Sequence, residues 1–154
     1  MSAPLGRYDD DKILNIGTNR WSFKPELGVS KALGPLTLEL ASGVTFYTDN
    51  TDFFGGRTQE QDPLYSLQGH VIYQFPRGFW GSLDATYYAG GRTTVNGVEN
   101  DDRQENVRLG LTLAIPLDRH FSIKFYASTG VYSRTSNDFT AVGTALQYRW
   151  GGGY

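Results

Sequence analysis

The chain has 154 residues, a length typical of one domain, with 39% hydrophobic residues, 14% aromatic residues and a formal net charge of −2. The near-neutral charge gives no reason to expect a nucleic-acid partner, and the absence of cysteine excludes disulfides, thiolate metal sites and a cysteine nucleophile. The two histidines, His70 and His120, are far apart in the sequence, so we expect neither a histidine-based metal site nor a cofactor.

Alternating apolar and polar residues predict about seven strands, each roughly ten residues long, which is the length that a tilted strand needs to cross a bilayer. In chain order the predicted strands span residues 21–33, 36–47, 65–75, 79–89, 106–117, 121–133 and 139–150. Tight turns at 34–35, 76–78 and 118–120 alternate with polar loops at 48–63 and 90–105 and with a medium loop that carries Thr135, Ser136 and Asn137. Tight turns on one side and longer loops on the other are typical of outer-membrane barrels.

The sequence therefore predicts an all-β fold, an antiparallel up-and-down transmembrane β-barrel in the bacterial outer membrane. Bacterial barrels close with an even number of strands, and residues 1–6 lack the basic and apolar regions of a signal peptide. We therefore expect the chain to be the C-terminal part of a larger, even-stranded barrel. Residues 1–20 would form an extracellular loop or a truncated N-terminal segment, and residues 21–154 would form the barrel strands.

The two faces of each predicted strand differ in polarity. In the strand 106–117, Leu109 and Leu111 alternate with Arg108 and Thr112, and almost every charge in the strands lies on the polar face. Lys31 is the exception, near a predicted membrane edge where a long side chain can reach water. A charge at the midplane of the lipid face would cost roughly 2–4 kcal/mol, so this distribution favours an apolar face in lipid. A soluble sandwich or lipocalin-like barrel also alternates, but with its apolar face inward.

The last predicted strand, 139–150, resembles the C-terminal strand that the barrel-assembly machinery recognises. A glycine is followed there by alternating apolar and aromatic residues, in the pattern Gly143, Leu146, Tyr148 and Trp150. The resemblance implies that the assembly machinery and outer-membrane lipid are partners of the chain.

Five stretches carry a second resemblance, and together they span nearly the whole chain: residues 15–23, 46–50, 61–64, 84–91 and 147–150. They resemble a family of outer-membrane, transporter-like barrels named for a MetA pathway of phenol degradation. The resemblance implies a barrel that handles small solutes, and it supplies no catalytic motif.

The polar faces of the predicted strands supply the candidate lumen-lining residues, which are Lys24, Glu26, Glu39, Gln68, His70, Asp84, Arg108, Lys124, Gln147 and Arg149. They could form a selective lining that contacts the solute, or a mixed-sign network that fills a narrow barrel. Acids and bases are nearly balanced, so no strong ion selectivity is expected. Five aromatic residues in the inward phase could form a path for phenolic solutes or could simply fill the interior: Tyr47, Trp80, Tyr88, Tyr126 and Tyr132.

Two other kinds of site remain open from the residues alone. The acidic clusters at residues 9–11, at Asp49 with Asp52 and at 101–102 could bind Ca²⁺, but solvated outer loops are the favoured explanation. Asp84 with His70 suggests a hydrolase, but no serine motif or second acidic partner supports it, and we expect no enzyme.

The leading hypothesis is an outer-membrane channel that passes small, aromatic or otherwise hydrophobic, solutes by passive or facilitated diffusion without a cofactor. The alternative is a structural or partner-binding barrel with a plugged lumen.

Overall fold

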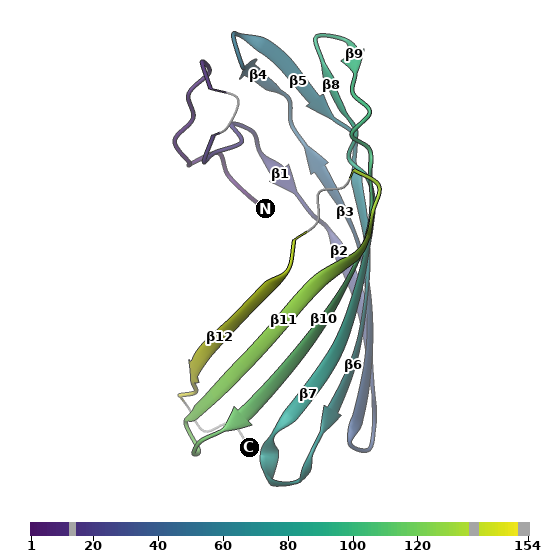
Figure 1. Cartoon of the computed structure of the whole chain (residues 1–154), viewed down its shortest axis with the longest axis vertical. Helices are drawn as coiled ribbons and strands as arrows, with labels where there is room; N and C mark the ends of the chain where they lie inside the picture. The colour runs from purple at the N-terminus through teal and green to yellow at the C-terminus, as the bar shows by residue number, and fades with distance from the viewer. Residues whose placement is uncertain (13–14, 136–138, 151–154) are drawn as a thin grey trace.

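Two antiparallel sheets make up the computed structural model, which describes residues 1–12, 15–135 and 139–150 (Figure 1). The eight-stranded sheet contains β1 (Ser22–Phe23), β2 (Glu26–Leu33), β3 (Leu36–Tyr47), β6 (Leu64–Gln74), β7 (Trp80–Gly90), β10 (Gln104–Pro116), β11 (Phe121–Ser133) and β12 (Ala141–Tyr148). The four-stranded sheet contains β4 (Asn50–Phe53), β5 (Arg57–Gln61), β8 (Thr93–Val95) and β9 (Val98–Glu99). A short 3₁₀ helix, η1 (Pro76–Gly78), turns the chain between β6 and β7. None of the described helical residues forms a helix long and apolar enough to cross a membrane.

The strands of the larger sheet follow the predicted strands closely. β3 and β11 have the predicted bounds, and most of the other ends differ by one or two residues. The first predicted strand, 21–33, is divided into β1 and β2 around Pro25, which cannot donate a ladder hydrogen bond. The last strand, β12, is two residues shorter at each end than the predicted 139–150, and the carbonyl of Phe139 accepts a hydrogen bond from the Arg108 side chain. Residues 136–138 of the predicted medium loop and residues 151–154 lie outside the described residues.

The loops predicted at 48–63 and 90–105 are instead largely β-structure, because each folds back as a hairpin and β5 pairs with β8 across the two. In the second hairpin Asn96 and Gly97 both have positive φ (48° and 78°), as a two-residue hairpin turn requires. The Asn96 side chain also accepts a hydrogen bond from the amide of Thr58 at 2.9 Å. The Asn-Gly pair was a hairpin signal that the sequence analysis assigned only to a loop.

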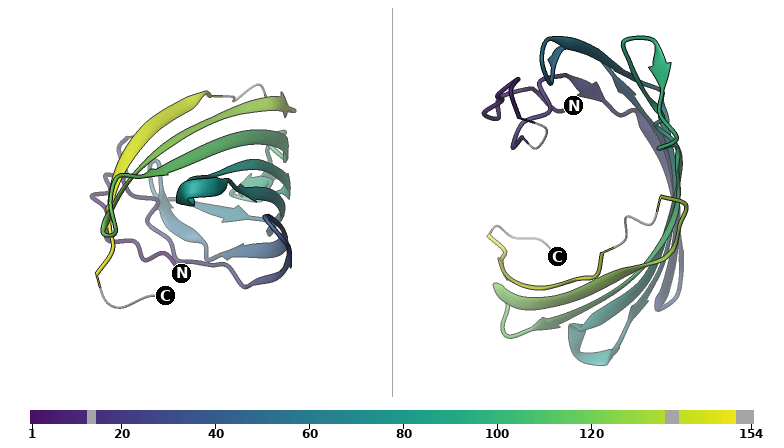
Figure 2. Two further views of the ribbon diagram at one scale, coloured as in Figure 1. Left: turned by 90° about the horizontal axis from the view of Figure 1, so that it is seen from below. Right: turned by 45° about the horizontal axis from the view of Figure 1, so that its top comes forward.

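The larger sheet bends into a deep trough with a convex outer face and a concave inner face (Figures 1 and 2). The sheet order runs from β1 and β2 through β3, β6, β7, β10 and β11 to β12. Among the described residues no strand joins β2 to β12, and the sheet stays open along that side. The tight turns lie at one end of the trough, and the four-stranded sheet with the N-terminal segment lies at the other.

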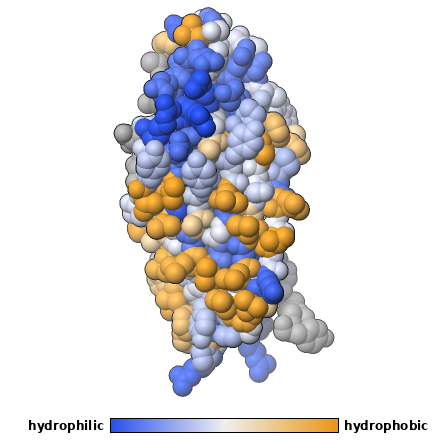
Figure 3. All heavy atoms as spheres, turned by 90° about the vertical axis from the view of Figure 1, so that its right-hand side faces the viewer, coloured by the Kyte–Doolittle hydropathy of each residue, from blue (hydrophilic) through white to orange (hydrophobic). Residues whose placement is uncertain are grey.

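Polarity is inverted relative to a soluble domain. Leu83 on the outer face is 62% exposed, whereas its neighbour Ser82 on the inner face is 7% exposed. The exposed apolar residues form a band across the outer face, between a hydrophilic end and a few polar turn residues (Figure 3). An exposed apolar surface of this extent needs lipid or another apolar partner.

Candidate functional site

The inner face of the trough gathers the polar side chains that alternate with the apolar band. Paired residues in an antiparallel sheet point to the same side. One row therefore places Ser30, Glu39, His70 and Asp84 side by side on β2, β3, β6 and β7. Tight turns connect β2 to β3 and β6 to β7, and β3 pairs directly with β6. Strand alternation and hairpin register together assemble the row.

His70 and Asp84 form the closest contact in this row. His70 Nδ1 lies 2.5 Å from Asp84 Oδ1, and the Ser82 hydroxyl donates to the other carboxylate oxygen at 3.1 Å. The two side chains are 29% and 24% exposed, so solvent in the trough still reaches them. In the same row the Ser30 hydroxyl donates to Glu39 Oε1 at 3.1 Å. The structure thus brings together the acid and the imidazole that the sequence singled out.

A second polar group lies near the break between β1 and β2. Lys24 Nζ is 2.6 Å from Glu26 Oε2, and the Gln68 amide donates to the same oxygen at 3.2 Å. These three predicted lining residues are therefore bonded to one another across β2 and β6. A closed network of this kind holds both charges in place and leaves little net charge facing the trough.

Two predicted lining cations are held against aromatic rings. The Arg108 guanidinium lies 3.9 Å from the centre of the Phe139 ring and donates to Ser128 Oγ at 3.2 Å. Lys124 Nζ lies 5.4 Å from the centre of the Trp80 ring. Both contacts are short enough for cation–π attraction. Of these two rings, Trp80 is one that the sequence analysis assigned to a solute path, and it therefore also contacts a charge.

The remaining lining candidates, Gln147 and Arg149, lie at the end of the trough that carries the tight turns. They border a shallow hollow beside the 118–120 turn. Asp118 Oδ1 accepts the amides of His120 (2.6 Å) and Phe121 (2.8 Å), and these hydrogen bonds lower the pKa of the Asp118 carboxyl. The His70 row continues through Gly110 and Ser128 to Ala141, so Gln147 and Arg149 lie several residues away from it along the chain.

The five predicted aromatic residues are dispersed over the sheet. Among the described residues no ring–ring contact joins any two of them. Tyr126 covers Gly143 on the neighbouring strand, where a Cβ atom would lie 2.4 Å from the ring. A β-bulge shifts the register so that Tyr132 pairs with Val107 of the apolar face, which removes Tyr132 from the regular inward phase. A single path through all five is not visible in the structure.

Gly143, Leu146, Tyr148 and Trp150 fall on both faces of the last strand. Gly143 makes room for Tyr126 on the inside, while Tyr148 packs against Phe121 with ring centres 4.9 Å apart on the outside. Trp150 continues this aromatic group at 6.3 Å from Tyr148. Aromatic clusters at the edge of an apolar band are typical of the membrane interface.

Two residues at the other end of the trough were not singled out by their chemistry. Asn50 is 1% exposed, donates to the Tyr8 hydroxyl at 2.9 Å and accepts from the Asn19 amide at 3.0 Å. Arg20 lies over the Tyr47 ring at 4.7 Å and donates to the Gln61 side chain, and burial lowers the pKa of its guanidinium. These contacts fasten the N-terminal segment, residues 1–20, to the rim of the trough, which is the end formed by the four-stranded sheet of β4, β5, β8 and β9. No local pattern could have revealed them, since their partners are about 30 to 40 residues away in the sequence.

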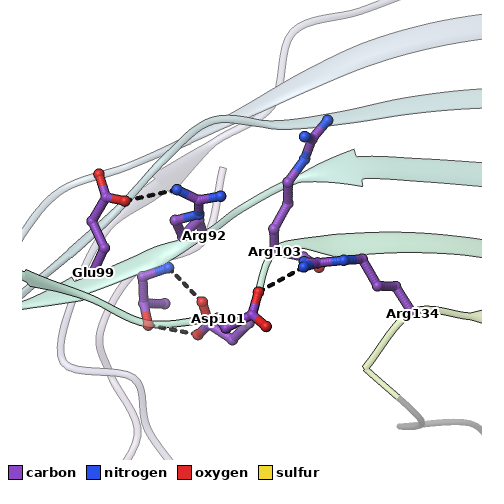
Figure 4. A network of polar contacts seen from close by, with 7 residues as sticks. Arg92, Glu99, Asp101, Arg103 and Arg134 are labelled. Atoms are coloured by element: carbon purple, nitrogen blue, oxygen red, sulfur yellow. Dashed lines mark hydrogen bonds and ion pairs between the residues drawn. The ribbon is translucent and has the colours of Figure 1, made fainter.

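Several acidic loop residues of the rim have protein partners. Asp101 pairs with Arg134 at 2.6 Å (Figure 4). Asp102 accepts both the amide and the hydroxyl of Thr93, at 2.8 and 2.6 Å. Arg92 pairs with Glu99 at 2.7 Å in the same region. At the N-terminus, Lys12 bonds to Asp9 at 2.7 Å and lowers the pKa of that carboxyl. The clusters at 9–11 and 101–102 are thus, at least in part, ion-pair and hydrogen-bond networks.

Comparison with known proteins agrees with this geometry. The family model described as "Putative MetA-pathway of phenol degradation" matches residues 1–150. The chain belongs to this family. Among solved structures, an outer membrane channel from Pseudomonas putida F1 matches with a TM-score of 0.85 and 25% sequence identity, over 95% of this chain and 55% of that one. The chain therefore spans about half the length of that channel, and no curated protein matches it.

These matches confirm the predicted fold class and location. The protein is an antiparallel β-barrel protein of the bacterial outer membrane. The apolar band of Figure 3 is then its lipid-facing surface, and the concave face lines the interior.

Proposed function

We propose that the protein forms the wall of an outer-membrane channel that passes small, aromatic or otherwise hydrophobic, solutes by passive or facilitated diffusion. The observation that carries the proposal is the polar inner face, where side chains of both signs line a trough whose outer face is apolar. A lining of paired charges is compatible with water and gives little preference for ions of either sign. The solved relative is itself an outer membrane channel.

The solute class rests on two supports. The family description refers to phenol degradation, and aromatic side chains such as Trp80 and Tyr88 alternate with the polar residues of the inner face. In our proposal Glu39, His70, Asp84 and Arg108 set the width and polarity of the path, and no cofactor or energy source takes part.

The proposed orientation follows the lengths of the connections. Outer-membrane barrels keep tight turns in the periplasm and long connections outside. The four-stranded sheet and residues 1–20 would then be extracellular, and the end of β12 would face the periplasm with its assembly strand.

A barrel with a blocked lumen is the second candidate. It is favoured by the N-terminal segment, which is fastened at the proposed mouth through Tyr8, Arg20 and the amide of Gly55, bonded to Asp10 at 2.9 Å. If this segment covers the mouth, loops and rim would bind partners and no solute would pass.

A barrel enzyme using Asp84 and His70 is the weakest candidate. Ser82 and His70 both contact the carboxylate of Asp84, so the structure shows no bond from the imidazole to the hydroxyl it would have to activate. In our proposal the pair is structural. An Asp84→Ala variant should leave any hydrolytic activity on candidate esters at background level, equal to the parent; a specific loss of activity would revive the enzyme.

Single-channel conductance of the native protein, extracted from outer membranes and placed in a planar bilayer, separates the first two candidates. We expect discrete openings with weak ion selectivity, partly blocked by added phenol. Folded, heat-modifiable protein that never conducts would support the blocked barrel instead. Conductance that appears only after residues 1–20 are removed would identify that segment as the block.

A further inference from the structure

A hollow in the inner wall lies close to the rim, above the His70 row. It has a volume of about 360 Å³, and its lining includes Leu64, Tyr88, Asn106, Arg108, Ser133 and Phe139. Small-molecule sites commonly have volumes of about 300–1,000 Å³ and combine apolar walls with a few polar groups. The hollow therefore has the size and the mixed lining of a site for a small solute.

Among the described residues, two polar atoms in the residues that line the hollow lack hydrogen-bond partners. Within the part of the chain that the structure describes, Asn106 Oδ1 and Ser133 Oγ are buried and have no hydrogen-bond partner. The two residues are direct partners in the β10–β11 ladder, so both atoms belong to the same spot of the wall. Buried polar atoms are nearly always hydrogen-bonded, and an unpaired one costs free energy. Two such atoms at one spot leave hydrogen-bonding capacity unmet in the lining of the hollow.

The surroundings define what that partner should be. An amide oxygen accepts a hydrogen bond only, whereas a serine hydroxyl can donate or accept. Both atoms are closed to solvent in the structure, so a solute reaches them only when the two side chains turn toward the hollow; a single hydroxyl group could then donate to Asn106 Oδ1 and accept from Ser133 Oγ. Tyr88 pairs with Asn106 from the other side, and its ring with the Leu64 side chain provides an apolar wall for a flat body.

Arg108 makes the hollow less suited to an anion than its charge suggests. Its guanidinium lies over the Phe139 ring at 3.9 Å and donates to Ser128 Oγ and to the Phe139 carbonyl, at 3.2 and 3.0 Å. These bonds direct the positive charge to protein groups. Asn106 Oδ1 and Ser133 Oγ would instead be satisfied by a neutral hydroxyl group.

We propose that this hollow is a binding subsite for a small neutral solute with a flat apolar body and one hydroxyl group. The subsite deepens the proposed function, since a solute would reach it through the lumen. It would hold the solute briefly beside Tyr88, and it would distinguish hydroxylated aromatic molecules from plain hydrocarbons of the same shape.

The test measures binding of phenol, toluene and benzoate to the folded full chain in lipid nanodiscs, by calorimetric titration. Toluene has nearly the shape of phenol but no hydroxyl, and benzoate carries a charge. We expect phenol to bind about tenfold more tightly than toluene, because only phenol pairs the buried atoms. Equal binding of phenol and toluene, or preferred binding of benzoate, would overturn the proposal.

Variants locate the effect. Asn106→Leu and Ser133→Ala should each weaken phenol binding several-fold and should leave toluene binding equal or tighter, since each removes an unpaired polar atom. Thr112→Val is the matched control, on the inner face of the same strand β10 but outside the hollow. Phenol binding that is the same in Asn106→Leu, Ser133→Ala and Thr112→Val would show that the hollow is not the site.

Conductance without solute, recorded on the same samples, separates this subsite from the channel itself. Protein that conducts but shows no phenol preference would remove the subsite and leave the channel. Protein that never conducts but binds phenol in an Asn106-dependent way would retain the subsite and remove the channel.

Discussion

The wall of the trough and its rim are stabilised in different ways. In the wall, neighbouring strands are joined by hairpins, and residues such as His70 and Asp84 meet because a regular ladder aligns them. At the rim, Asn50 and Arg20 meet partners that no ladder aligns, through individual side-chain hydrogen bonds. A charge placed on the wrong face should therefore destabilise the wall. Loss of a single side-chain hydrogen bond should instead loosen the rim. The following experiments would break or sharpen that comparison.

The largest effect is expected from a charge on the wrong face of the wall. Leu111→Lys places an ammonium group on the lipid face near the middle of β10, which should destabilise the barrel by roughly 2–4 kcal/mol. Thr112→Lys, one residue later, directs the same charge inward and should be tolerated. Urea unfolding in lipid vesicles measures both. Equal destabilisation of the two variants would contradict the assignment of faces.

A substitution at Gly143 tests packing inside the wall. A Cβ atom there would lie 2.4 Å from the Tyr126 ring, so Gly143→Ala should force the ring aside and cost about 1–3 kcal/mol. Gly69→Ala is the control, because no atom lies within 4 Å of a Cβ built at that glycine. Refolding from urea into vesicles separates this effect from recognition of the last strand by the assembly machinery. The proposed contact would be wrong if both variants unfolded at the same urea concentration.

At the rim, Asn50→Ala should release the N-terminal segment while the wall stays folded. The change removes the bonds to Tyr8 and Asn19 and leaves both groups with unmet polar atoms, at a local cost of about 1–3 kcal/mol. Hydrogen exchange should then quicken in residues 1–20 but not in β6 or β7. The neighbouring exposed residue supplies the control, Asp49→Ala. Faster exchange throughout the barrel would show that rim and wall are one cooperative unit.

The smallest effect is expected at the 118–120 turn. Hydrogen bonds from two backbone amides lower the pKa of Asp118 below its ordinary value of 3.8. The turn is therefore stabilised fully above that ordinary value, and the stabilisation is lost as the pH falls through the lower pKa of the folded protein. The urea midpoint of the parent should fall over this acidic range relative to that of Asp118→Asn, measured in parallel. A constant difference between the two proteins would show that the carboxylate does not stabilise the turn.

Most of the wall was predictable because its pattern is local. A period of two residues reveals which side chains share a face, and short turns reveal which strands are neighbours. The row from Ser30 to Asp84 needs only these two rules. Lys31, the exception on the apolar face, pairs with Leu38 close to the tight turn of that hairpin, where the sequence analysis expected a membrane edge.

The rim and the inner hollow were less predictable because their contacts join residues that no local sequence pattern relates. The Asn96-Gly97 turn was a local signal for the second sheet, but the pairing of β5 with β8 joins two separate hairpins. The bulge that moves Tyr132 off its phase interrupts the very rule that predicted its position. Asn106 and Ser133 look like ordinary inner-face residues in the sequence, and only the structure shows that, among its described residues, Asn106 Oδ1 and Ser133 Oγ are buried without partners on paired positions.

The sequence by itself determined the all-β wall, its two faces and its outer-membrane location, because alternation and turn length are written along the chain. Only the tertiary structure decided how charges on the inner face pair, how the N-terminal segment is fastened and where the wall leaves a hollow. Those features depend on which side chains of different segments come into contact, and the curvature of the sheet helps to determine these contacts.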